Sequence, residues 1–446
     1  MVYLLYDCIL LLAALVLIPC YYFRGVKYRS FRQGIKERLG FFAPGRLDCL
    51  AGRRVFWIHA VSVGETRAAL PLVKALKKEY PQAALVISNV TETGHEIASQ
   101  VAEADCCLFF PYDFSPVVRR VLRRIRPALI VIVETEIWPN FIRLANESGI
   151  PVVLVNGRIS DRSYPRYQWI KMFIRPVLQQ FSRFCMQTAE DARRLRMLGA
   201  PVGKVRISGN VKFDLDIPLP DDDDAARLRK RFHLPGAELV WVAGSTHAGE
   251  EEAVVDVYQR LAGEETRLRL VLVPRHPERC SGVGKMLAER GIPFVRRCEL
   301  TAAAPPVAAG TVLLVDTVGE LQQLCAVADL VFVGGSLVPV GGHNVLEASA
   351  VRRPVIFGPY MHNFREISQL LLAAGGGIMV ADAGELLEVV RQLVGSGKKR
   401  QALGNAGYEL IDKNRGATAF TLEMIRDVLA GGDPEQWENR RKATVT

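Results

Sequence analysis

The chain has 446 residues, a net charge of +10 and a hydrophobic content of 49%. This length is sufficient for two domains of ordinary size, and the hydrophobic content excludes a disordered protein. The positive charge favours nucleic acid, anionic lipid or an acidic substrate as a partner. The nine cysteines form no CxxC pair and no Cys/His metal spacing, so neither a disulfide framework nor a zinc site is expected.

The first segment in chain order is an apolar run, residues 2–23, that is about long enough to span a bilayer. Asp7 and Pro19 are its only interruptions. The flank that follows is basic, with Arg24, Lys27, Arg29, Arg32, Lys36 and Arg38. The positive-inside rule places such a flank in the cytoplasm. We therefore predict a single N-terminal transmembrane anchor, residues 1–23, with the rest of the chain cytoplasmic; a buried core helix is the alternative.

Continuous apolar strands alternate with amphipathic helices after residue 53. In the first half, strand composition is found at residues 55–62, 84–88, 129–133, 151–160, 184–187 and 205–208. Strands without a polar alternation are typical of a parallel sheet that is covered on both faces. The stretch DLDIPLPDDDD, residues 214–224, then reads as a linker, and the alternation restarts at residue 239. The predicted fold is α/β, with two doubly wound domains at residues 24–216 and 217–446.

The predicted strand ends carry different chemistry in the two halves. Ligands of doubly wound sheets bind at the carboxyl ends of the strands. In the first half these ends carry mostly carboxylates and one lysine, and in the second half they carry hydroxyls, cations and helix starts. An acid/base half combined with an anion-binding half is the arrangement of a transferase.

Three glutamates and a lysine are the candidates in the first half. Glu65 directly follows Gly64 at a strand end, where it could take a proton from a hydroxyl, although the helix dipole alone also favours a glutamate in a first turn. Glu134 and Glu136 flank Thr135 after an apolar strand, so they point the same way if the backbone is extended. Two like charges at a buried strand end are costly without a cation, which favours a functional site over a solvated surface. Lys212, which follows a later strand, would add a second cation, beside Arg275, near the cleft.

The second half offers an anion site. VFVGGSLVPVGGHNVLEA, residues 331–348, reads as a strand, a glycine-rich turn and a helix start, which would turn backbone N–H groups toward an anion. Asn344 and Glu347 could equally be an ordinary capping pair. Arg275 ends an apolar strand and suits a phosphate. His276 and His343 lack metal-ligand spacing and are more simply explained as hydrogen-bonding residues.

Several familiar sites are absent from the sequence. It contains no P-loop, no GxGxxG after the first strand and no GxSxG, which argues against a P-loop nucleotidase, a nicotinamide enzyme and an α/β hydrolase. Basic residues gather in the first domain, at 116–127 and 158–175, and aromatic residues interleave with the second group. Beside a predicted anchor, this pattern favours an anionic bilayer and a phosphorylated lipid over nucleic acid.

Seven motifs together resemble the Kdo transferases, which are membrane-anchored glycosyltransferases of lipopolysaccharide assembly with the GT-B fold. They occur in the order of the family across nearly the whole chain: HAVSVGE (59–65), ETEIWPN (134–140), GNVKFD (209–214), STHAGEE (245–251), PRHPER (274–279), DTVGEL (316–321) and GGSLVPVGGHNVLEA (334–348). The resemblance implies two Rossmann-like domains and an inner-membrane location.

The resemblance also implies a reaction and its residues. Kdo (3-deoxy-manno-octulosonic acid) would pass from CMP-Kdo to the lipid A precursor, lipid IVA, with inversion and without a metal or another cofactor. Glu65 matches the family's catalytic base, while Glu134 and Lys212 match residues that support the transition state. The segments that match contacts to CMP contain Pro274, Arg275, Val318, Gly319, Glu320, Asn344, Val345, Leu346 and Glu347. Val318 departs from the family, which usually has methionine there.

Three other functions remain open from the sequence. The nearest is a different GT-B transferase, such as one that moves a sugar from UDP to a lipid. A sugar-nucleotide epimerase of similar fold is a second possibility, although the predicted anchor and the basic first domain argue against it. The third is a membrane scaffold without activity, which would not need acids and cations at strand ends.

Overall fold

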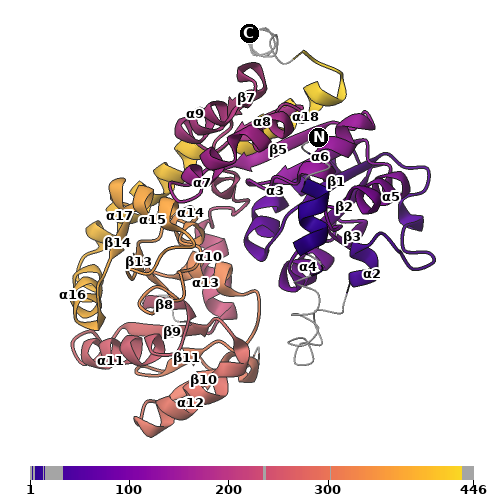
Figure 1. Ribbon diagram of the computed structural model, residues 1–446. Coiled ribbons are helices and arrows are strands. Elements are labelled where there is room, and N and C mark those ends of the chain that lie inside the picture. Colours follow the sequence, from indigo (N-terminus) through magenta and orange to yellow (C-terminus); the bar gives the residue numbers. More distant parts are fainter. Residues whose placement is uncertain are drawn as a thin grey trace. The chain divides into compact units, whose positions relative to one another are not determined.

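The computed structural model describes residues 3, 6–13, 15, 34–234, 238–301 and 303–433. The chain divides into two compact units (Figure 1). Unit 1 combines Met1–Asp214 with Asn414–Thr446, and unit 2 is Leu215–Lys413. The first boundary lies close to the predicted one between residues 216 and 217. The C-terminal end differs from the predicted domains, because residues from Asn414 onward group with unit 1.

Unit 1 contains a parallel sheet of seven described strands in the order β3-β2-β1-β4-β5-β6-β7. The sequence had predicted every strand except β3, whose four residues are too few to show a pattern. The strands are β1 Val55–His59, β2 Ala84–Asn89, β3 Cys106–Phe109, β4 Leu129–Val133, β5 Val152–Gly157, β6 Arg183–Met186 and β7 Val205–Ile207.

Helices cover both faces of this sheet, as continuous apolar strands require. Their described members are α2 Ile35–Arg38, α3 Val63–Glu79, α4 Glu92–Ser99, α5 Ser115–Ile125, α6 Pro139–Glu147, α7 Tyr164–Trp169, α8 Lys171–Leu178, α9 Ala189–Leu198 and α18 Ala417–Leu429. Short 3₁₀ helices add η3 Asp48–Leu50, η4 Val202–Lys204 and η5 Val211–Phe213.

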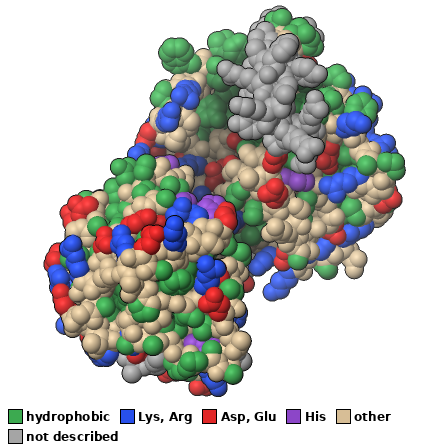
Figure 2. All heavy atoms as spheres, turned by 90° about the horizontal axis from the view of Figure 1, so that it is seen from below, with side chains coloured by type: hydrophobic (Ala, Val, Ile, Leu, Met, Phe, Trp, Pro, Cys, Tyr) green, Lys and Arg blue, Asp and Glu red, His purple; other side chains and the backbone are tan. Residues whose placement is uncertain are grey.

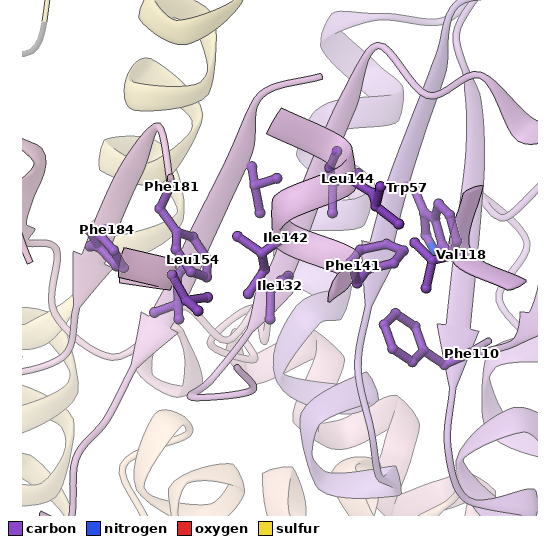
Figure 3. Close-up of a cluster of buried hydrophobic side chains, with 14 of the residues drawn as sticks. Trp57, Phe110, Val118, Ile132, Phe141, Ile142, Leu144, Leu154, Phe181 and Phe184 are labelled. Atoms are coloured by element: carbon purple, nitrogen blue, oxygen red, sulfur yellow. The ribbon is translucent and has the colours of Figure 1, made fainter. Parts of the chain in front are cut away.

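Successive residues of a strand contribute to different cores. Trp57 of β1 packs with Phe141 of α6, their ring centroids 5.0 Å apart, and Figure 3 shows this core between the sheet and its helices. Phe56 and Ile58, on the opposite face of the same strand, belong to the core under α3. The sheet is therefore fixed from both sides, which makes its strand ends a rigid platform.

The C-terminal helix α18 belongs to the second of these cores. Its apolar side contributes Met424 and Ile425, which pack with Leu72 and Val73 of α3. The helix has no capping side chain of its own at Gly416. The Asp214 carboxylate accepts hydrogen bonds from the backbone N–H of Gly416, at 2.7 Å, and of Thr418. Asp214, at which the chain leaves unit 1, thus fixes the segment in which the chain returns to unit 1.

Unit 2 has the same architecture. Its seven described strands form a parallel sheet in the order β10-β11-β9-β8-β12-β13-β14. The strands are β8 Leu239–Thr246, β9 Leu268–Pro274, β10 Phe294–Arg296, β11 Val312–Leu314, β12 Leu330–Val333, β13 Val355–Phe357 and β14 Gly377–Met379. The predicted two-domain α/β fold is confirmed.

The helices of unit 2 begin in the linker region. They are α10 Asp222–Arg231, α11 Glu250–Ala262, α12 Cys280–Glu289, α13 Leu321–Val327, α14 Leu346–Ala350, α15 Arg365–Ala373, α16 Ala383–Val394 and α17 Gly397–Asn414, with the 3₁₀ helices η6 Pro277–Arg279 and η7 Arg297–Glu299. The aspartate run predicted as a linker caps and opens α10, where Asp221 accepts a hydrogen bond from the N–H of Asp224 at 2.6 Å.

Most of the predicted membrane span lies outside the described residues, as does its basic flank up to Arg32. Residues 6–13 are helical, and their Asp7 carboxylate accepts hydrogen bonds from Ser115 Oγ, at 2.6 Å, and Asn140 Nδ2, at 2.7 Å. Ile9, Leu11 and Leu12 are exposed. Among the residues that the structure describes, no helix is both long and apolar enough to cross a membrane. The transmembrane anchor therefore stays a prediction.

We predict that Asp214→Ala destabilises unit 1 by about 1 kcal/mol, the usual value of a helix cap. Two backbone N–H groups at the start of α18 would lose their acceptor. Urea unfolding followed by intrinsic fluorescence measures the change. Asp216→Ala, at an exposed residue two positions away, is the control. Equal unfolding curves for the two variants would contradict this role of Asp214.

Candidate active site

The strand order of unit 1 brings its candidate acids to one place. The chain builds β1, β2 and β3 outward in one direction and then adds β4 on the other side of β1. This reversal is a topological switch point, where doubly wound sheets bind their ligands. Glu65 follows β1, and Glu134 and Glu136 follow β4, so three carboxylates lie beside the switch point.

Glu65 is held in place by the start of α3. Its Oε2 accepts a hydrogen bond from the N–H of Val61 at 2.6 Å, and its Oε1 accepts one from Ser62 Oγ at 3.2 Å. Ser62 is the N-cap of α3 and accepts in return from the N–H of Glu65. Burial raises the pKa of Glu65 to about 7, and the charges of Glu134 and Glu136 act in the same direction. The residue is both a capping glutamate and a carboxyl group suited to proton transfer near neutral pH.

Glu134 forms an ion pair with Lys212, a pairing that the sequence did not predict. Lys212 Nζ lies 3.3 Å from Glu134 Oε1, and about a quarter of each side chain is exposed. The backbone at Glu134 is left-handed, with φ 59, which is uncommon for a residue other than glycine and is frequent at functional sites. The extended geometry assumed from the sequence therefore does not hold at Glu134.

Glu136 is a third acid of this cluster, although the resemblance assigned no role to it. Burial raises its pKa to about 7, with a further contribution from the charge of Glu134. The charge of Glu136 in turn raises the pKa of Tyr167 of α7, which burial already raises. Glu136 is thus close enough to α7 for its charge to act on Tyr167. Its spacing from Glu134 was the sequence signal for this position.

A buried polar network positions Lys212. Asn210 Oδ1 accepts a hydrogen bond from the N–H of Lys212 at 3.0 Å and caps η5. Asn210 Nδ2 donates to Gln187 Oε1 at 2.9 Å, and Gln187 Nε2 donates to the backbone oxygen of Asn156 at 2.9 Å. Asn156 Oδ1 accepts from the N–H of Val211 at 3.1 Å. The ends of β5, β6 and β7 therefore fix the backbone from which Lys212 reaches Glu134.

In unit 2 the glycine-rich turn after β12 binds a carboxylate of the protein itself, the side chain of Glu250. The carboxylate of Glu250 accepts hydrogen bonds from the N–H of Gly335, Ser336 and Leu337 at 2.6, 2.9 and 2.8 Å. It also accepts from the N–H of His247 at 2.9 Å, and it is fully buried. These N–H groups are therefore engaged within the protein, contrary to the expectation that they meet a ligand.

The start of α14 shows the capping pair that the sequence left open. Asn344 Oδ1 accepts a hydrogen bond from the N–H of Leu346 at 3.1 Å, and Asn344 Nδ2 donates to Glu347 Oε1 at 3.2 Å. The N-cap position is Val345, one residue later than predicted. Val345 and Leu346 are buried, so only their backbone could contact a ligand. The helix itself has five residues.

The other residues that the resemblance assigned to CMP contacts lie on loops after β9 and β11. Arg275 follows Pro274, and its N–H donates to the backbone oxygen of Thr246 at 3.0 Å, which joins the ends of β8 and β9. Val318 is 84% exposed, and Gly319 next to it is left-handed with φ 87. Exposure leaves the position of Val318 tolerant of either valine or methionine.

Glu320 is held by two arginines. Arg231 lies 3.0 Å and Arg297 3.2 Å from its carboxylate oxygens, and Thr317 Oγ1 also donates to it. Its exposed fraction is 9%. The carboxylate is thus engaged in fixing the loop that presents Val318 and Gly319.

A histidine pair near Glu250 is a feature that sequence reasoning missed. His247 Nε2 lies 2.9 Å from His343 Nε2, and the two rings are nearly parallel. One of these nitrogens must carry the hydrogen and the other must accept it. Burial lowers the pKa of His247. Within the described parts of the chain, no group of three or more histidine, cysteine or acidic side chains could hold a metal ion.

Solved structures of sugar-nucleotide enzymes share the fold. UDP-GlcNAc 2-epimerase from Neisseria meningitidis bound to UDP-GlcNAc matches with a TM-score of 0.56 and 14% sequence identity, over 84% of this chain and all of that chain (100%). At this identity the likeness shows the fold alone. The fold is therefore the GT-B-like arrangement of two α/β domains that the resemblance implied.

Sequence comparison identifies the family. The family described as 3-deoxy-D-manno-octulosonic-acid transferase (kdotransferase) matches residues 33–215. A 3-deoxy-D-manno-octulosonic acid transferase from Haemophilus influenzae is 36% identical over 94% of this chain and 97% of its own length. One from Bordetella pertussis is 33% identical over 87% of this chain and 92% of its own length. The chain belongs to the Kdo transferase family and is a glycosyltransferase.

The acid cluster predicts how the stability of unit 1 depends on pH. A raised carboxyl pKa means that the folded state binds more protons than the unfolded state between the model value of 4.5 and about 7. Stability therefore falls as the pH rises through this window. We expect Glu136→Gln to lose roughly 2 kcal/mol less unfolding free energy than wild type as the pH rises through this window. A shift of one pKa unit corresponds to about 1.4 kcal/mol, and partial exposure of the side chain reduces the contribution of Glu136.

Urea unfolding of unit 1 at about pH 5.5 and about pH 8 measures this difference. Glu96→Gln, at an exposed glutamate of α4, is the matched control and should keep the wild-type pH dependence. If Glu136→Gln also keeps the wild-type dependence, Glu136 does not hold its proton in the folded protein.

Proposed function

We propose that the protein transfers Kdo from CMP-Kdo to the lipid A precursor of lipopolysaccharide, with inversion at the anomeric carbon. Membership of the family supports the reaction class. The observation that carries the proposal is the carboxyl group of Glu65, fixed at the end of β1 with a pKa of about 7. A base of this pKa is half-ionised near neutral pH and can accept a proton without a large energetic cost.

The chemical step needs one bond to form and one to break. The acceptor hydroxyl oxygen forms a bond to the anomeric carbon of Kdo, and its proton passes to Glu65. The bond between that carbon and the phosphate oxygen breaks, and CMP leaves with the electron pair. Attack from the side opposite to CMP inverts the configuration. The Glu134–Lys212 pair supplies fixed charges for the transition state, and the network through Asn210 limits their reorganisation.

The donor is assigned to unit 2. We infer that Arg275 binds the phosphate of CMP-Kdo, and that Pro274, Val318, Gly319 and the backbone of Asn344, Val345 and Leu346 shape the nucleotide site. The arginines around Glu320 favour a role in holding its loop rather than in proton transfer. Glu347, paired with Asn344, is assigned to a hydroxyl of the ligand.

The transfer assay uses the full chain in detergent, CMP-Kdo generated in situ and a tetra-acylated lipid A precursor, and mass spectrometry detects the product. A product heavier by one or more Kdo units is expected. Glu65→Gln should lower kcat by roughly 100- to 10,000-fold, the usual contribution of a general base. The amide oxygen of Gln still accepts from Val61, so α3 keeps its cap. Glu96→Gln is the control.

The pH dependence and donor binding complete this test. Wild-type turnover should increase as the pH rises through about 7, because only ionised Glu65 accepts the proton. Thermal shifts should show protection of both wild type and Glu65→Gln by CMP, and less by UDP. Near-normal turnover of Glu65→Gln would refute its role as the base. Absence of product from folded protein with intact donor would refute the reaction.

We further propose that residues 1–23 anchor the enzyme in the inner membrane with both units in the cytoplasm. The apolar run and its basic flank support this topology. The full chain should stay in the membrane fraction after alkaline carbonate washing. A reporter enzyme that works only in the cytoplasm should be active when it is fused to the C-terminus. Release of the full chain by carbonate would argue against an integral anchor.

A further inference from the structure

The pair of His247 and His343 lies at the switch point of unit 2. The chain builds β8 first, adds β9 and two further strands on one side, and then places β12 on the other side of β8. His247 directly follows β8, and His343 belongs to the glycine-rich turn after β12. Doubly wound sheets bind their ligands at such a point, beside the carboxyl ends of the strands. The pair is therefore located where a ligand of unit 2 is expected.

The fold holds the two rings in contact. Their Nε2 atoms are 2.9 Å apart and their planes differ by 4°. Gly335 lies against both rings, because a Cβ atom on it would be 3.0 Å from Cδ2 of His343 and 3.4 Å from Cδ2 of His247. The buried Glu250 carboxylate accepts from the N–H of Gly335 at 2.6 Å and from the N–H of His247 at 2.9 Å. One carboxylate thus fixes both the backbone that carries His247 and the backbone on which the rings pack.

The pair can accept one proton and keep its hydrogen bond. A neutral pair has one hydrogen between the two Nε2 atoms and another on Nδ1 of the accepting ring. An added proton goes to Nδ1 of the donating ring, whereas a second one would put two hydrogens between the Nε2 atoms and break the bond. Among the described residues no hydrogen bond to His247 Nδ1 is found, so this atom can meet a ligand. A singly protonated pair thus presents a positive charge and an N–H donor to an anion.

The surroundings keep the pair neutral until an anion binds beside it. Burial lowers the pKa of His247, three basic neighbours act in the same direction, and an acidic neighbour opposes them. Figure 2 shows histidine side chains at the surface with basic and acidic side chains around them. A bound anion favours the charged form of a nearby histidine. The basic neighbours are His276, Arg279 and Arg275, the acidic one is Glu250, and further out lie Glu251, paired with Arg279, and His362, which lies against Gly341.

We propose that the His247–His343 pair binds the sugar carboxylate of the donor and takes up one proton when the donor binds. The inference rests on the proposed function, whose donor has two anionic groups, the phosphate and the Kdo carboxylate. In an ulosonic acid the carboxyl carbon is bonded to the anomeric carbon, so the carboxylate lies close to the phosphate. The phosphate is assigned to Arg275, whose N–H donates to the backbone oxygen of Thr246, the residue before His247. The two anion sites are therefore adjacent.

The second anion needs a site of its own, because the glycine-rich turn is already occupied. The N–H groups of residues 335–337 bind the Glu250 carboxylate. A pair that becomes charged only with the ligand places no unpaired cation in the free protein. It also gives the donor site a means of selection, since a sugar nucleotide whose sugar is neutral has no carboxylate to bind there. The pair would thus be a specificity determinant for a CMP-linked sugar acid.

Calorimetry with two non-hydrolysable donor analogues tests the proposal on the full chain in detergent. In both analogues a phosphonate links cytidine to the anomeric carbon of Kdo; one keeps the carboxylate, and the other has a neutral carboxamide in its place. Wild type should bind the carboxylate analogue roughly 10- to 100-fold more tightly, the usual value of a hydrogen bond between charged groups. Titrations in buffers of different ionisation enthalpy should show uptake of about one proton with the carboxylate analogue alone, so its affinity should fall as the pH rises.

The variants His343→Gln and His276→Gln separate the pair from its neighbour. Glutamine is polar but takes up no proton, so His343→Gln should lose the preference for the carboxylate and the proton uptake, and should keep its affinity for the carboxamide analogue. His276 contacts the ring of His247 edge-on without joining the hydrogen bond of the pair, so His276→Gln is the matched control and should keep both properties. Proton uptake by wild type tests the proposal even if His343→Gln does not fold.

The possible results distinguish this inference from the proposed function. Equal binding of both analogues by wild type would overturn the inference and leave the proposed donor standing. Equal weakening of both analogues in His343→Gln would assign the pair to the phosphate or to the fold and would also overturn it. The same holds if His276→Gln alone loses the preference, because the carboxylate then binds at His276. Failure of folded wild type to bind either analogue would refute the proposed donor itself.

Discussion

A buried carboxylate has to find hydrogen-bond donors or a cation, and this constraint shapes the strand ends of both units. In unit 1 the donors come from the N-terminus of α3 for Glu65 and from Lys212 for Glu134. In unit 2 four backbone N–H groups bind Glu250, and two arginines bind Glu320. The difference is functional. Glu250 and Glu320 are engaged by these donors and hold loops, whereas Glu65 has a raised pKa and remains able to exchange a proton.

The layout of unit 1 follows from the same constraint. Carboxylates of like charge raise one another's pKa, so a nearby cation stabilises a cluster of three. Lys212 supplies it for Glu134 alone, at 3.3 Å, and three strand ends are used to fix its backbone. The cluster thereby contains one acid paired with a cation and two whose pKa is about 7. That division of roles suits a site in which one carboxylate stabilises charge and another accepts a proton.

The sequence was sufficient for features that depend on local pattern. Continuous apolar strands predicted both sheets, and acids placed directly after strands predicted Glu65, Glu134 and their neighbour Glu136. It was insufficient where the partner lies far away in the chain. Glu250 meets the turn at residues 335–337 only through the pairing of β8 with β12, and Arg231 meets Glu320 across 89 residues. The grouping of α18 with unit 1 was missed for the same reason, since its partner α3 lies far away in the chain. The strand β3 was missed because its four residues are too few to show a pattern.

The hydrogen bonds of Asp214 have a consequence for the way the chain is assembled. Unit 2 is one continuous segment, residues 215–413, whose two flanking positions in unit 1 are joined by a carboxylate at 2.7 Å from Gly416 N. In topological terms unit 2 is an insertion into a discontinuous host domain. During synthesis the host cannot complete the core under α3 until Met424 and Ile425 have been translated. All strands of unit 2 have been translated by then, so unit 2 can fold before unit 1 is complete.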